Sequence, residues 1–369
     1  MTTARVISSS TSTALKPEKS WHHHLTIDLF LTVLNRTFLH PFVAWMLPLS
    51  LRAQATPYTH TAMQATIAWA SLLTLIYILG LISDRIAYGA AREVDLSDEV
   101  IVVTGGASGL GALIADVYGM RGANVAVVDV RNVEEDEAEE KGIVYYECDV
   151  GDRKQVEEVR KKIEEDLGTP TILINNAGIV NGKPLLDLSP EEIERTFRVN
   201  TLSHFHTLQT FLPGMLASDR GTIVTISSVL ARLGAANLSD YTASKAALLA
   251  LHSSLRAELA RNPQAQNIRT ILCTPGQLST PMFARVKTPS SFFAPVVAPV
   301  DVAKEIIKMV DRGESGEIAV PLYARWIGWL GVLPVGVQSI VRVWSGVDAA
   351  MANGIMGKTM TTEEDEKTS

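Results

Sequence analysis

A tyrosine and a lysine that could exchange a proton with a substrate stand four residues apart, at Tyr241 and Lys245. They lie in the segment DYTASKAALLALHSSLRAELA, whose composition predicts a helix with both side chains on one face. A phenol with a pKa of about 10 is a poor base at neutral pH unless a nearby cation favours its phenolate. The lysine can supply that cation, which suggests general acid–base chemistry. Taken alone, the pair is equally consistent with an amphipathic helix that carries these two residues by chance.

A glycine-rich turn follows the first short apolar run, VIVVTG, and reads Thr104-Gly105-Gly106-Ala107-Ser108-Gly109-Leu110-Gly111. It continues into ALIADVYGMRGA, which has helical periodicity. Glycines at such a turn let the backbone approach a pyrophosphate at the positive end of the helix. A dinucleotide is therefore expected here, a glycine-rich turn without a ligand being the alternative. The expected cofactor-binding residues of the turn are Gly105, Ser108, Gly109, Leu110 and Gly111.

An acidic residue, Asp129, ends the second apolar run, 18 residues after the last glycine of the turn. A carboxylate at this point can accept hydrogen bonds from the ribose hydroxyls of adenosine and would repel a 2′-phosphate. NAD is therefore expected in preference to NADP, although the neighbouring Arg131 leaves NADP possible.

The elements that must position these residues alternate along the chain. Seven short runs rich in β-branched residues predict strands at 100–105, 123–130, 142–150, 171–178, 221–228, 267–275 and 316–321. Amphipathic segments such as RKQVEEVRKKIEEDLG and DVAKEIIKMVDRG stand between them. This alternation predicts an α/β fold with a single Rossmann-like, doubly wound parallel sheet of seven strands, covered on both faces.

Four motifs in order give the chain a resemblance to the short-chain dehydrogenase/reductase family. They are the T-G-x-x-x-G-x-G turn, Asn175-Asn176-Ala177-Gly178, Tyr241-x-x-x-Lys245 and Pro275-Gly276, and the resemblance spans about Asp95 to Pro321. It implies that Tyr241 and Lys245 also contact the cofactor and that Thr280 holds the nicotinamide carboxamide. It further implies that Asp149 faces the adenine with Val150 beside it, and that the backbone of Asn176, Ala177 and Gly178 supports the cofactor.

The same resemblance implies a complete catalytic set of Asn200, Ser228, Tyr241 and Lys245. Ser228 stands 13 residues before Tyr241, at the family's position for the serine that polarises the substrate oxygen, and Ser227 would point away. Asn200 matches the asparagine thought to hold a water in the proton path. Hydride transfer to or from nicotinamide needs such a proton partner. A regulatory relative without activity would be expected to have lost at least one of the four residues.

A membrane-associated region is expected ahead of the catalytic domain, at residues 21–92. Residues 53–83 contain no Asp, Glu, Lys or Arg, and the 19 residues ATIAWASLLTLIYILGLIS (65–83) predict a transmembrane helix, because 19 helical residues span about 29 Å. A buried core helix is the alternative. Leu25 to Leu51 carries Asp28, Arg36, Pro41 and Pro48 and predicts an interfacial or re-entrant helix pair.

The remaining segments complete the expected organisation. Residues 1–20 form a polar tail, with a mitochondrial presequence as an alternative, and 93–321 form the NAD(P)-binding catalytic domain. Residues 322–358 predict apolar helices that lie on the membrane or cover the substrate pocket, and 359–369 predict a disordered tail.

The motif region looks most like the membrane-associated branch of the family that contains retinol and 17-beta-hydroxysteroid dehydrogenases. This implies a lipophilic alcohol or carbonyl substrate of the retinoid, steroid or long-chain lipid class, at the endoplasmic reticulum or on lipid droplets. It also allows a homodimer. Arg85 and Arg92 after the apolar helix, and a glycosylation sequon at Asn237 close to Tyr241, favour a catalytic domain that faces the cytosol.

Composition excludes other classes. A net charge of −7 argues against nucleic-acid binding, and two cysteines, Cys148 and Cys273, suit a reducing compartment and lack metal-ligand spacing. No metal site is expected. Three functions stay open: an NAD-preferring oxidoreductase of a lipophilic alcohol or ketone, an NADP-dependent reductase of a lipid ketone or specialised metabolite, and a catalytically silent, dinucleotide-sensing membrane scaffold.

Overall fold

A computed structural model describes residues 26–131, 142–283, 292 and 294–348. The predicted polar tail (1–20), the end of the predicted apolar C-terminal segment and the predicted charged tail (359–369) lie outside these residues.

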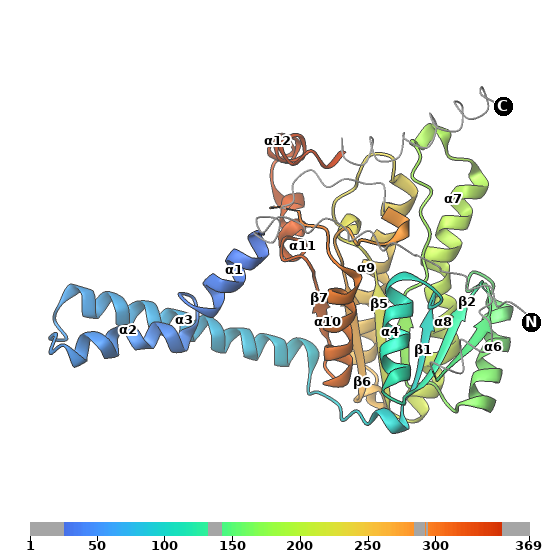
Figure 1. Cartoon of the computed structure of the whole chain (residues 1–369), viewed down its shortest axis with the longest axis horizontal. Helices are drawn as coiled ribbons and strands as arrows, with labels where there is room; N and C mark the ends of the chain where they lie inside the picture. The colour runs from blue at the N-terminus through green and yellow to red at the C-terminus, as the bar shows by residue number, and fades with distance from the viewer. Residues whose placement is uncertain (1–25, 132–141, 284–291, 293, 349–369) are drawn as a thin grey trace, which may run out of the picture.

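Seven parallel strands form one sheet in the order β3-β2-β1-β4-β5-β6-β7 (Figure 1). The strands are β1 (Val100–Thr104), β2 (Asn124–Asp129), β3 (Ile143–Glu147), β4 (Ile172–Asn175), β5 (Gly221–Ile226), β6 (Ile268–Cys273) and β7 (Gly316–Ile318). The strand order reverses between β1 and β4, the switch point at which open α/β sheets bind ligands. The predicted doubly wound parallel sheet is confirmed.

The strands end earlier than the apolar runs predict. Asp149 and Val150 follow β3 in a turn, and Ser227 and Ser228 follow β5. Parallel pairing stops at the carboxyl edge of the sheet, where the chain turns away into loops. These residues therefore lie on loops at the edge that faces a ligand.

Helices cover both faces of the sheet. Helices α4 (Gly109–Met120) and α10 (Pro299–Asp311) pack on one face, and α6 (Arg153–Asp166), α8 (Ser203–Ala217) and α9 (Ser239–Ala260) pack on the other. The short α7 (Pro190–Phe197) leads to α8. Single 3₁₀ turns occur at Leu96–Asp98, Leu185–Asp187, Val229–Ala231, Pro263–Ala265 and Pro281–Phe283.

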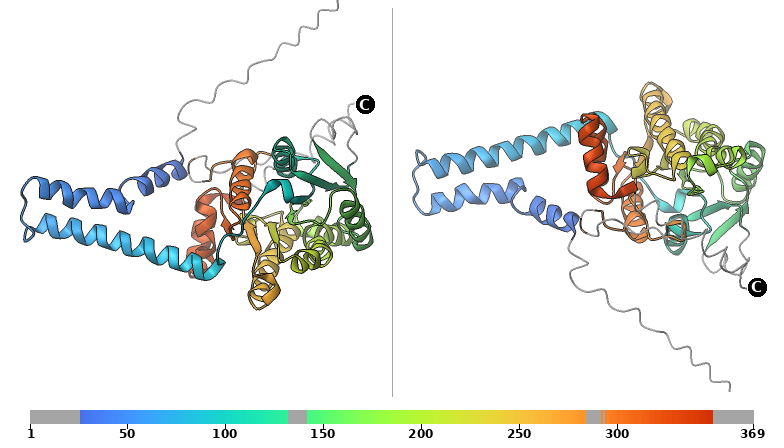
Figure 2. Two further views of the ribbon diagram at one scale, coloured as in Figure 1. Left: turned by 90° about the horizontal axis from the view of Figure 1, so that it is seen from below. Right: turned by 90° about the horizontal axis from the view of Figure 1, so that it is seen from above.

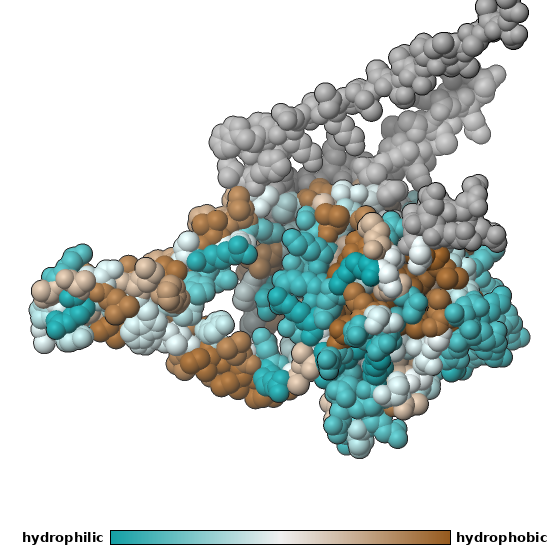
Figure 3. Space-filling model, turned by 60° about the horizontal axis from the view of Figure 1, so that its bottom comes forward, coloured by the Kyte–Doolittle hydropathy of each residue, from teal (hydrophilic) through white to brown (hydrophobic). Residues whose placement is uncertain are grey.

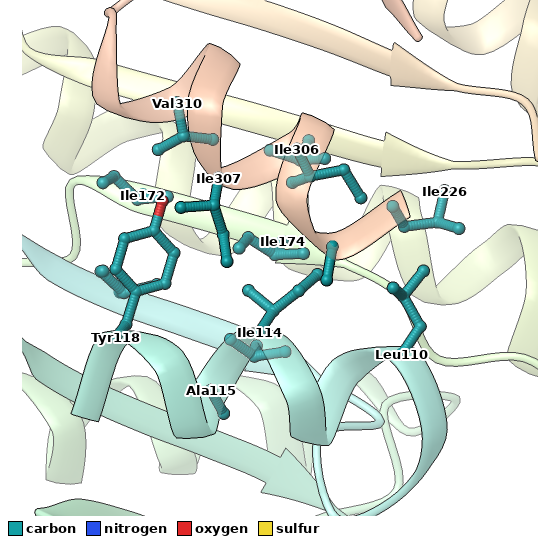
Figure 4. Packing of buried hydrophobic residues seen from close by; sticks show 14 of the residues in the cluster. Leu110, Ile114, Ala115, Tyr118, Ile172, Ile174, Ile226, Ile306, Ile307 and Val310 are labelled. Atoms are coloured by element: carbon teal, nitrogen blue, oxygen red, sulfur yellow. The ribbon is translucent and has the colours of Figure 1, made fainter. Parts of the chain in front are cut away.

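Alternation along each strand builds two hydrophobic layers. In β1, Ile101 and Val103 join the layer under α4 and α10, whereas Val100 and Val102 join the opposite layer. Figure 4 shows the first layer, where Ile114 of α4 and Ile306 of α10 approach each other over the sheet. These layers fix the start of α4, and therefore the glycine turn, against the strand ends.

Three helices before the sheet project away from it as an arm (Figures 1 and 2). They are α1 (Ile27–Arg36), α2 (Pro41–Ala53) and α3 (Thr61–Tyr88), of which α2 and α3 lie antiparallel as a hairpin. The Trp45 indole N–H donates to the Thr74 hydroxyl at 2.9 Å, and Ala44, Ala70 and Leu73 are buried between the helices. Helix α3, 28 residues long, is apolar and long enough to cross a membrane, and it is largely exposed. The helix extends beyond the predicted 65–83 at both ends.

The segment after β7 returns over the carboxyl edge of the sheet. It forms α11 (Tyr323–Trp326), a 3₁₀ helix (Ile327–Val332) and α12 (Val335–Ser345). Figure 1 shows α12 at the top of the molecule, on the side of the carboxyl edge of the sheet. These helices lie at 323–345, within the segment 322–358 for which the sequence predicts apolar helices.

Candidate active site

One cavity of about 1300 Å³ opens at the carboxyl edge of the sheet. It is lined by every predicted site residue except Gly111 and Asn200, which support the others from behind. The lining residues among the predictions are Gly105, Ser108, Gly109, Leu110, Asp129, Asp149, Val150, Asn176, Ala177, Gly178, Ser228, Tyr241, Lys245 and Thr280. The structure thus brings together residues from the carboxyl ends of strands β1 to β6, or the loops that follow them, and from helix α9.

The glycine turn is shaped by backbone conformations and contacts that only glycine allows. Gly105 has a φ of +62°, and a Cβ there would lie 2.8 Å from the Ala177 Cα. A Cβ at Gly111 would lie 2.5 Å from the Asn176 Nδ2, which explains why Gly111 packs under the turn and does not reach the cavity. Helix α4 begins directly after this turn, so its free N–H groups face the cavity.

The Asp129 carboxylate is held at the end of β2. One oxygen accepts the Ala107 N–H at 3.0 Å and the other accepts the Arg131 N–H at 3.1 Å. Asp129 and Arg131 both line the cavity. A fixed carboxylate here can accept bonds from neutral hydroxyls and opposes a second negative group.

Asn176 braces the glycine turn across the switch point. Its Nδ2 donates to the Thr104 and Gly105 carbonyl oxygens at 3.1 and 2.9 Å. The Thr104 hydroxyl accepts the backbone N–H groups of Asn176 and Ala177 at 3.0 and 3.2 Å. After β3, the Asp149 carboxylate accepts the Gly151 N–H at 2.8 Å, which fixes that loop beside Val150. These bonds form the frame of the dinucleotide half of the cavity.

Tyr241 and Lys245 lie in α9, as predicted, and both are almost fully buried. The Lys245 ammonium donates to the Ile226 carbonyl oxygen at 3.0 Å. Burial lowers the pKa of Lys245 to about 8 and raises the pKa of Tyr241 to about 12, an increase that a hydrogen bond from Ser228 opposes. The Ser228 oxygen also accepts the Leu230 N–H at 3.2 Å, whereas Ser227 donates to the Lys245 carbonyl at 2.9 Å. Ser228 is therefore the serine that reaches the phenol.

Asn200 occupies a π-helix at Arg198–Leu202, between α7 and α8. Its Oδ1 accepts the Ile179 N–H at 2.8 Å, and its Nδ2 donates to the Ile179 carbonyl at 3.0 Å and the Ser244 hydroxyl at 3.0 Å. A Cβ on Gly178 would lie 3.5 Å from the Asn200 Oδ1 and 3.4 Å from the Lys245 Nζ. The extra residue in this π-helical turn thus places the Asn200 carboxamide oxygen near Lys245.

Two buried histidines stand behind the lysine. Burial lowers the pKa of His204 to about 3 and of His252 to about 4, and Lys245 adds to the effect on His204. Both imidazoles are therefore neutral at pH 7. Lys245 is then the source of positive charge in this buried group.

The rest of the cavity is mostly apolar, although Arg195, Arg198 and Arg342 also line it, and the motifs do not predict these residues. The apolar lining consists of Ile27, Val180, Leu233, Met282, Phe283, Tyr323, Ile327, Leu330, Val341 and Trp344. The Phe283 ring meets the Tyr241 ring edge-on at 6.0 Å between centroids. The residues from Tyr323 onward lie in the segment 322–358, for which the sequence predicts apolar helices on the membrane or over the pocket. Apart from the Pro-Gly step that leads to this wall, no local sequence signal marks the others, because they come from distant segments.

The motifs also do not point to Asp240. This buried carboxylate accepts the Asn181 amide at 2.7 Å and the Thr196 hydroxyl at 2.9 Å, and so joins the loop after β4, helix α7 and the start of α9. Its position next to Tyr241 was the available signal. Within the described ranges, no group of three or more His, Cys, Asp or Glu side chains is placed to hold a metal ion.

Known proteins are similar to this chain over the region that forms the sheet and the cavity. A model of the short chain dehydrogenase family matches residues 99–290. The chain is 34% identical over 272 residues to short-chain dehydrogenase/reductase family 16C member 6 of Bos taurus, covering 72% of this chain and 85% of that protein. It is 32% identical over 276 residues to epidermal retinol dehydrogenase 2 of Mus musculus, covering 73% and 88%.

A solved structure shares the fold. The crystal structure of ribose-5-phosphate isomerase from Brucella melitensis 16M superposes with a TM-score of 0.54 at 23% identity, covering 62% of this chain and 93% of that one. At this identity the likeness concerns the fold alone.

Proposed function

Because this chain belongs to the short-chain dehydrogenase/reductase family of oxidoreductases, we propose that it interconverts a lipophilic alcohol and its carbonyl with a nicotinamide dinucleotide. The substrate class proposed is a retinoid, steroid or long-chain lipid alcohol. Relatives named retinol dehydrogenases support this class.

The observation that carries the proposal is a single cavity with two unlike halves. The glycine turn, Asp129 and Asn176 line one half, and apolar side chains from the C-terminal segment line the other. Tyr241, Ser228 and Lys245 lie where the halves meet. A charged cofactor and an apolar substrate can therefore share the cavity with the proton donor between them.

The proposed chemistry gives each polar residue one task. The bound nicotinamide would supply or accept the hydride. Tyr241 would move the proton of the substrate oxygen, and the Ser228 hydroxyl would hold that oxygen. Lys245 would favour the phenolate through its charge, and Asn200 would order the path by which a proton reaches solvent. Because burial raises the pKa of Tyr241 to about 12, the phenol is protonated at neutral pH and is ready to act as an acid.

We propose NAD as the cofactor because the Asp129 carboxylate faces the cavity at the end of β2, with NADP as the alternative because Arg131 also lines it. The residues present suit a dinucleotide: Gly105, Gly109 and the start of α4 would hold the pyrophosphate, and Thr280 would hold the carboxamide.

The apolar arm supports association with a membrane, proposed to be the endoplasmic reticulum or the surface of lipid droplets, with the catalytic domain in the cytosol. A homodimer is part of the same proposal.

The experiment compares wild-type protein with Tyr241→Phe. Purified protein is mixed with NAD and a panel of retinoid, steroid and long-chain alcohols, and the absorbance of reduced nicotinamide is followed. We expect turnover in the wild type and a loss of about 10²–10⁴-fold in Tyr241→Phe, with NAD binding retained. Tyr58→Phe, at the far end of the arm, is the matched control.

Full turnover by Tyr241→Phe would overturn the mechanism. NAD binding without turnover on the whole panel would support the scaffold function instead.

A further inference from the structure

Residues 26–92, which contain the arm, contact the catalytic domain at both ends. At the first end, the Ile27 N–H donates to the Phe292 carbonyl at 3.1 Å, and both Asp28 carboxylate oxygens lie 3.1 Å from the Leu322 N–H. The first turn of α1 is therefore attached to the wall of the cavity. Ile27 itself lines that cavity.

The second end is fastened by an arginine of α9. Arg256 donates to the Ala87 carbonyl at 2.9 Å, and its guanidinium lies over the Tyr88 ring at 4.6 Å from the centroid. A little further on, the Arg92 N–H donates to the Gly313 carbonyl at 2.9 Å. The start of α1 and the end of α3 thus both lie on the catalytic domain.

Between these ends, the arm exposes apolar side chains on all sides. In α3, Met63, Ala70 and Leu73 are buried, and Ala70 and Leu73 pack with Ala44 of α2. The exposed large apolar residues of the hairpin are Phe42, Trp45, Met46, Leu47, Leu49, Leu72, Leu75, Ile76, Tyr77, Ile78, Leu79, Leu81, Ile82 and Ile86. In Figure 3 the part of the arm nearest the catalytic domain carries a brown, hydrophobic surface. Helices of a water-soluble protein keep a continuous polar face, whereas between residues 65 and 82 the exposed side chains of α3 are apolar apart from Ser71 and the Tyr77 hydroxyl.

Charged residues are confined to the two ends of the hairpin. Along the first limb, residues 37–51 contain no Asp, Glu, Lys or Arg, and α2, with 13 residues, is about 20 Å long. Along the second limb, 53–83 contains none, and Asp84 and Arg85 follow next to the catalytic domain. The uncharged part of α3, residues 61–83, is about 34 Å long, close to the thickness of a bilayer's hydrocarbon core, about 30 Å.

The tip of the hairpin is polar, and its Arg52 side chain interacts with other residues of the tip. The Arg52 guanidinium lies over the Tyr58 ring at 4.8 Å from the centroid and donates to the Thr56 carbonyl. The helices on either side pair most of their backbone groups within the helix, as a segment in lipid must, with Pro48 as an interruption in α2. An apolar band between two polar ends is the pattern of a membrane insertion.

We propose that α2 and α3 form a re-entrant membrane hairpin, which enters the bilayer from the side of the catalytic domain and returns to that side. The start of α1 and the catalytic domain then share one side, and the tip around residues 54–60 lies in or beyond the far half of the bilayer. The partner of this surface is the lipid bilayer. The inference extends the membrane association proposed above, and its test does not need catalytic turnover.

The test introduces one reactive cysteine at a time into the full chain. The positions are Ser10→Cys before the arm, Thr59→Cys at the tip and Glu158→Cys on α6, and wild type is the background because Cys148 and Cys273 are buried. Sealed microsomes that carry the expressed protein are treated with a membrane-impermeant maleimide polymer, with and without detergent. Labelling is read as a gel shift.

We expect Ser10→Cys and Glu158→Cys to be labelled in sealed vesicles, and Thr59→Cys to be labelled only after detergent is added. Protection of Ser10→Cys while Glu158→Cys is labelled would show one crossing and overturn the proposal. Labelling of Thr59→Cys in sealed vesicles would also overturn it, because the hairpin would then lie outside the bilayer.

Discussion

Tyr241 is held in its protonated form by its surroundings, and this has a consequence for the pH dependence of the reaction. Alcohol oxidation needs the phenol to lose a proton, and burial raises the pKa of Tyr241 to about 12. We expect kcat/KM for oxidation to rise with pH from about 6.5, by up to about tenfold per pH unit. Above pH 8 the rise should become less steep, because Lys245, with a pKa of about 8, loses its charge. Carbonyl reduction needs the protonated phenol and should stay nearly flat over the same range. Initial rates in both directions measure this, and an oxidation rate independent of pH would contradict it.

Asp129 gives a second prediction at the scale of one residue. Its carboxylate would repel the 2′-phosphate of NADP, and a like-charge contact costs on the order of 1.4 kcal/mol or more. Asp129→Ala should therefore lower the ratio of kcat/KM for NAD to that for NADP by about tenfold or more. NAD use should also weaken, because the Ala107 N–H loses its acceptor. Asp187→Ala, exposed and away from the cavity, is the control. An unchanged ratio would count against Asp129 as the residue that selects the cofactor.

At the scale of elements, the first turn of α1 and the start of α11 act as one wall of the cavity. The Asp28 carboxylate holds the Leu322 N–H, and Tyr323 next to it lines the apolar half. We expect Asp28→Ala to raise KM for a lipophilic alcohol by about five- to tenfold, the effect of losing about 1–1.5 kcal/mol of hydrogen bonding, with KM for NAD unchanged.

Two measurements separate this effect from a loss of structure. Asp28→Asn keeps a carbonyl oxygen that accepts the Leu322 N–H and should restore most of the affinity. Hydrogen exchange in 322–327 should become faster in Asp28→Ala and stay unchanged in the control Asp84→Ala. If Asp28→Ala left both KM and exchange unchanged, Asp28 would have no part in the wall.

At the scale of the whole molecule, a buried ion cluster joins the arm to the sheet. Arg92 lies 2.7 Å and Arg220 3.0 Å from the fully buried Glu99 carboxylate. Glu99→Gln would leave Arg92 buried without its counter-ion, and we expect it to lower the free energy of unfolding by about 3–5 kcal/mol. Thermal unfolding in detergent measures this loss. Glu157→Gln, which removes an exposed ion pair with Arg153, should change stability by less than about 1 kcal/mol.

The same cluster should give the protein acid sensitivity. Burial alone would raise the pKa of Glu99, but hydrogen bonds from Arg92, Thr171 and Arg220 outweigh it and hold the pKa below the ordinary value. A carboxylate whose pKa is lower in the folded state stabilises the fold above its unfolded pKa of about 4.3, and this stability is lost as pH falls through the folded value. Glu99→Gln should unfold with less dependence on pH below about 5. An equal dependence in both proteins would place the acid sensitivity elsewhere.

The sequence predicted the parts of the molecule that local patterns determine. The seven β-branched runs and the glycine turn predicted the sheet and its ligand edge, because strand periodicity and turn geometry depend on neighbouring residues. The family resemblance is confirmed, and the residues it singled out meet around one cavity.

Contacts between distant segments could not be predicted in this way. Asp28 and Leu322 are 294 residues apart, and neither is marked by a motif. The raised pKa of Tyr241 depends on burial under Phe283 and its neighbours, which a spacing of four residues does not show. The antiparallel pairing of α2 with α3 depends on side chains such as Trp45 and Thr74 that meet only after folding.

Helix α12 lines the cavity, and its Val335, Ile340 and Val343 side chains are exposed. If the enzyme is bound to a membrane with this cavity at the lipid surface, its substrate reaches it by lateral diffusion in the bilayer. Its velocity should then follow the mole fraction of substrate among the lipids, and adding empty vesicles at constant total substrate should slow it by surface dilution.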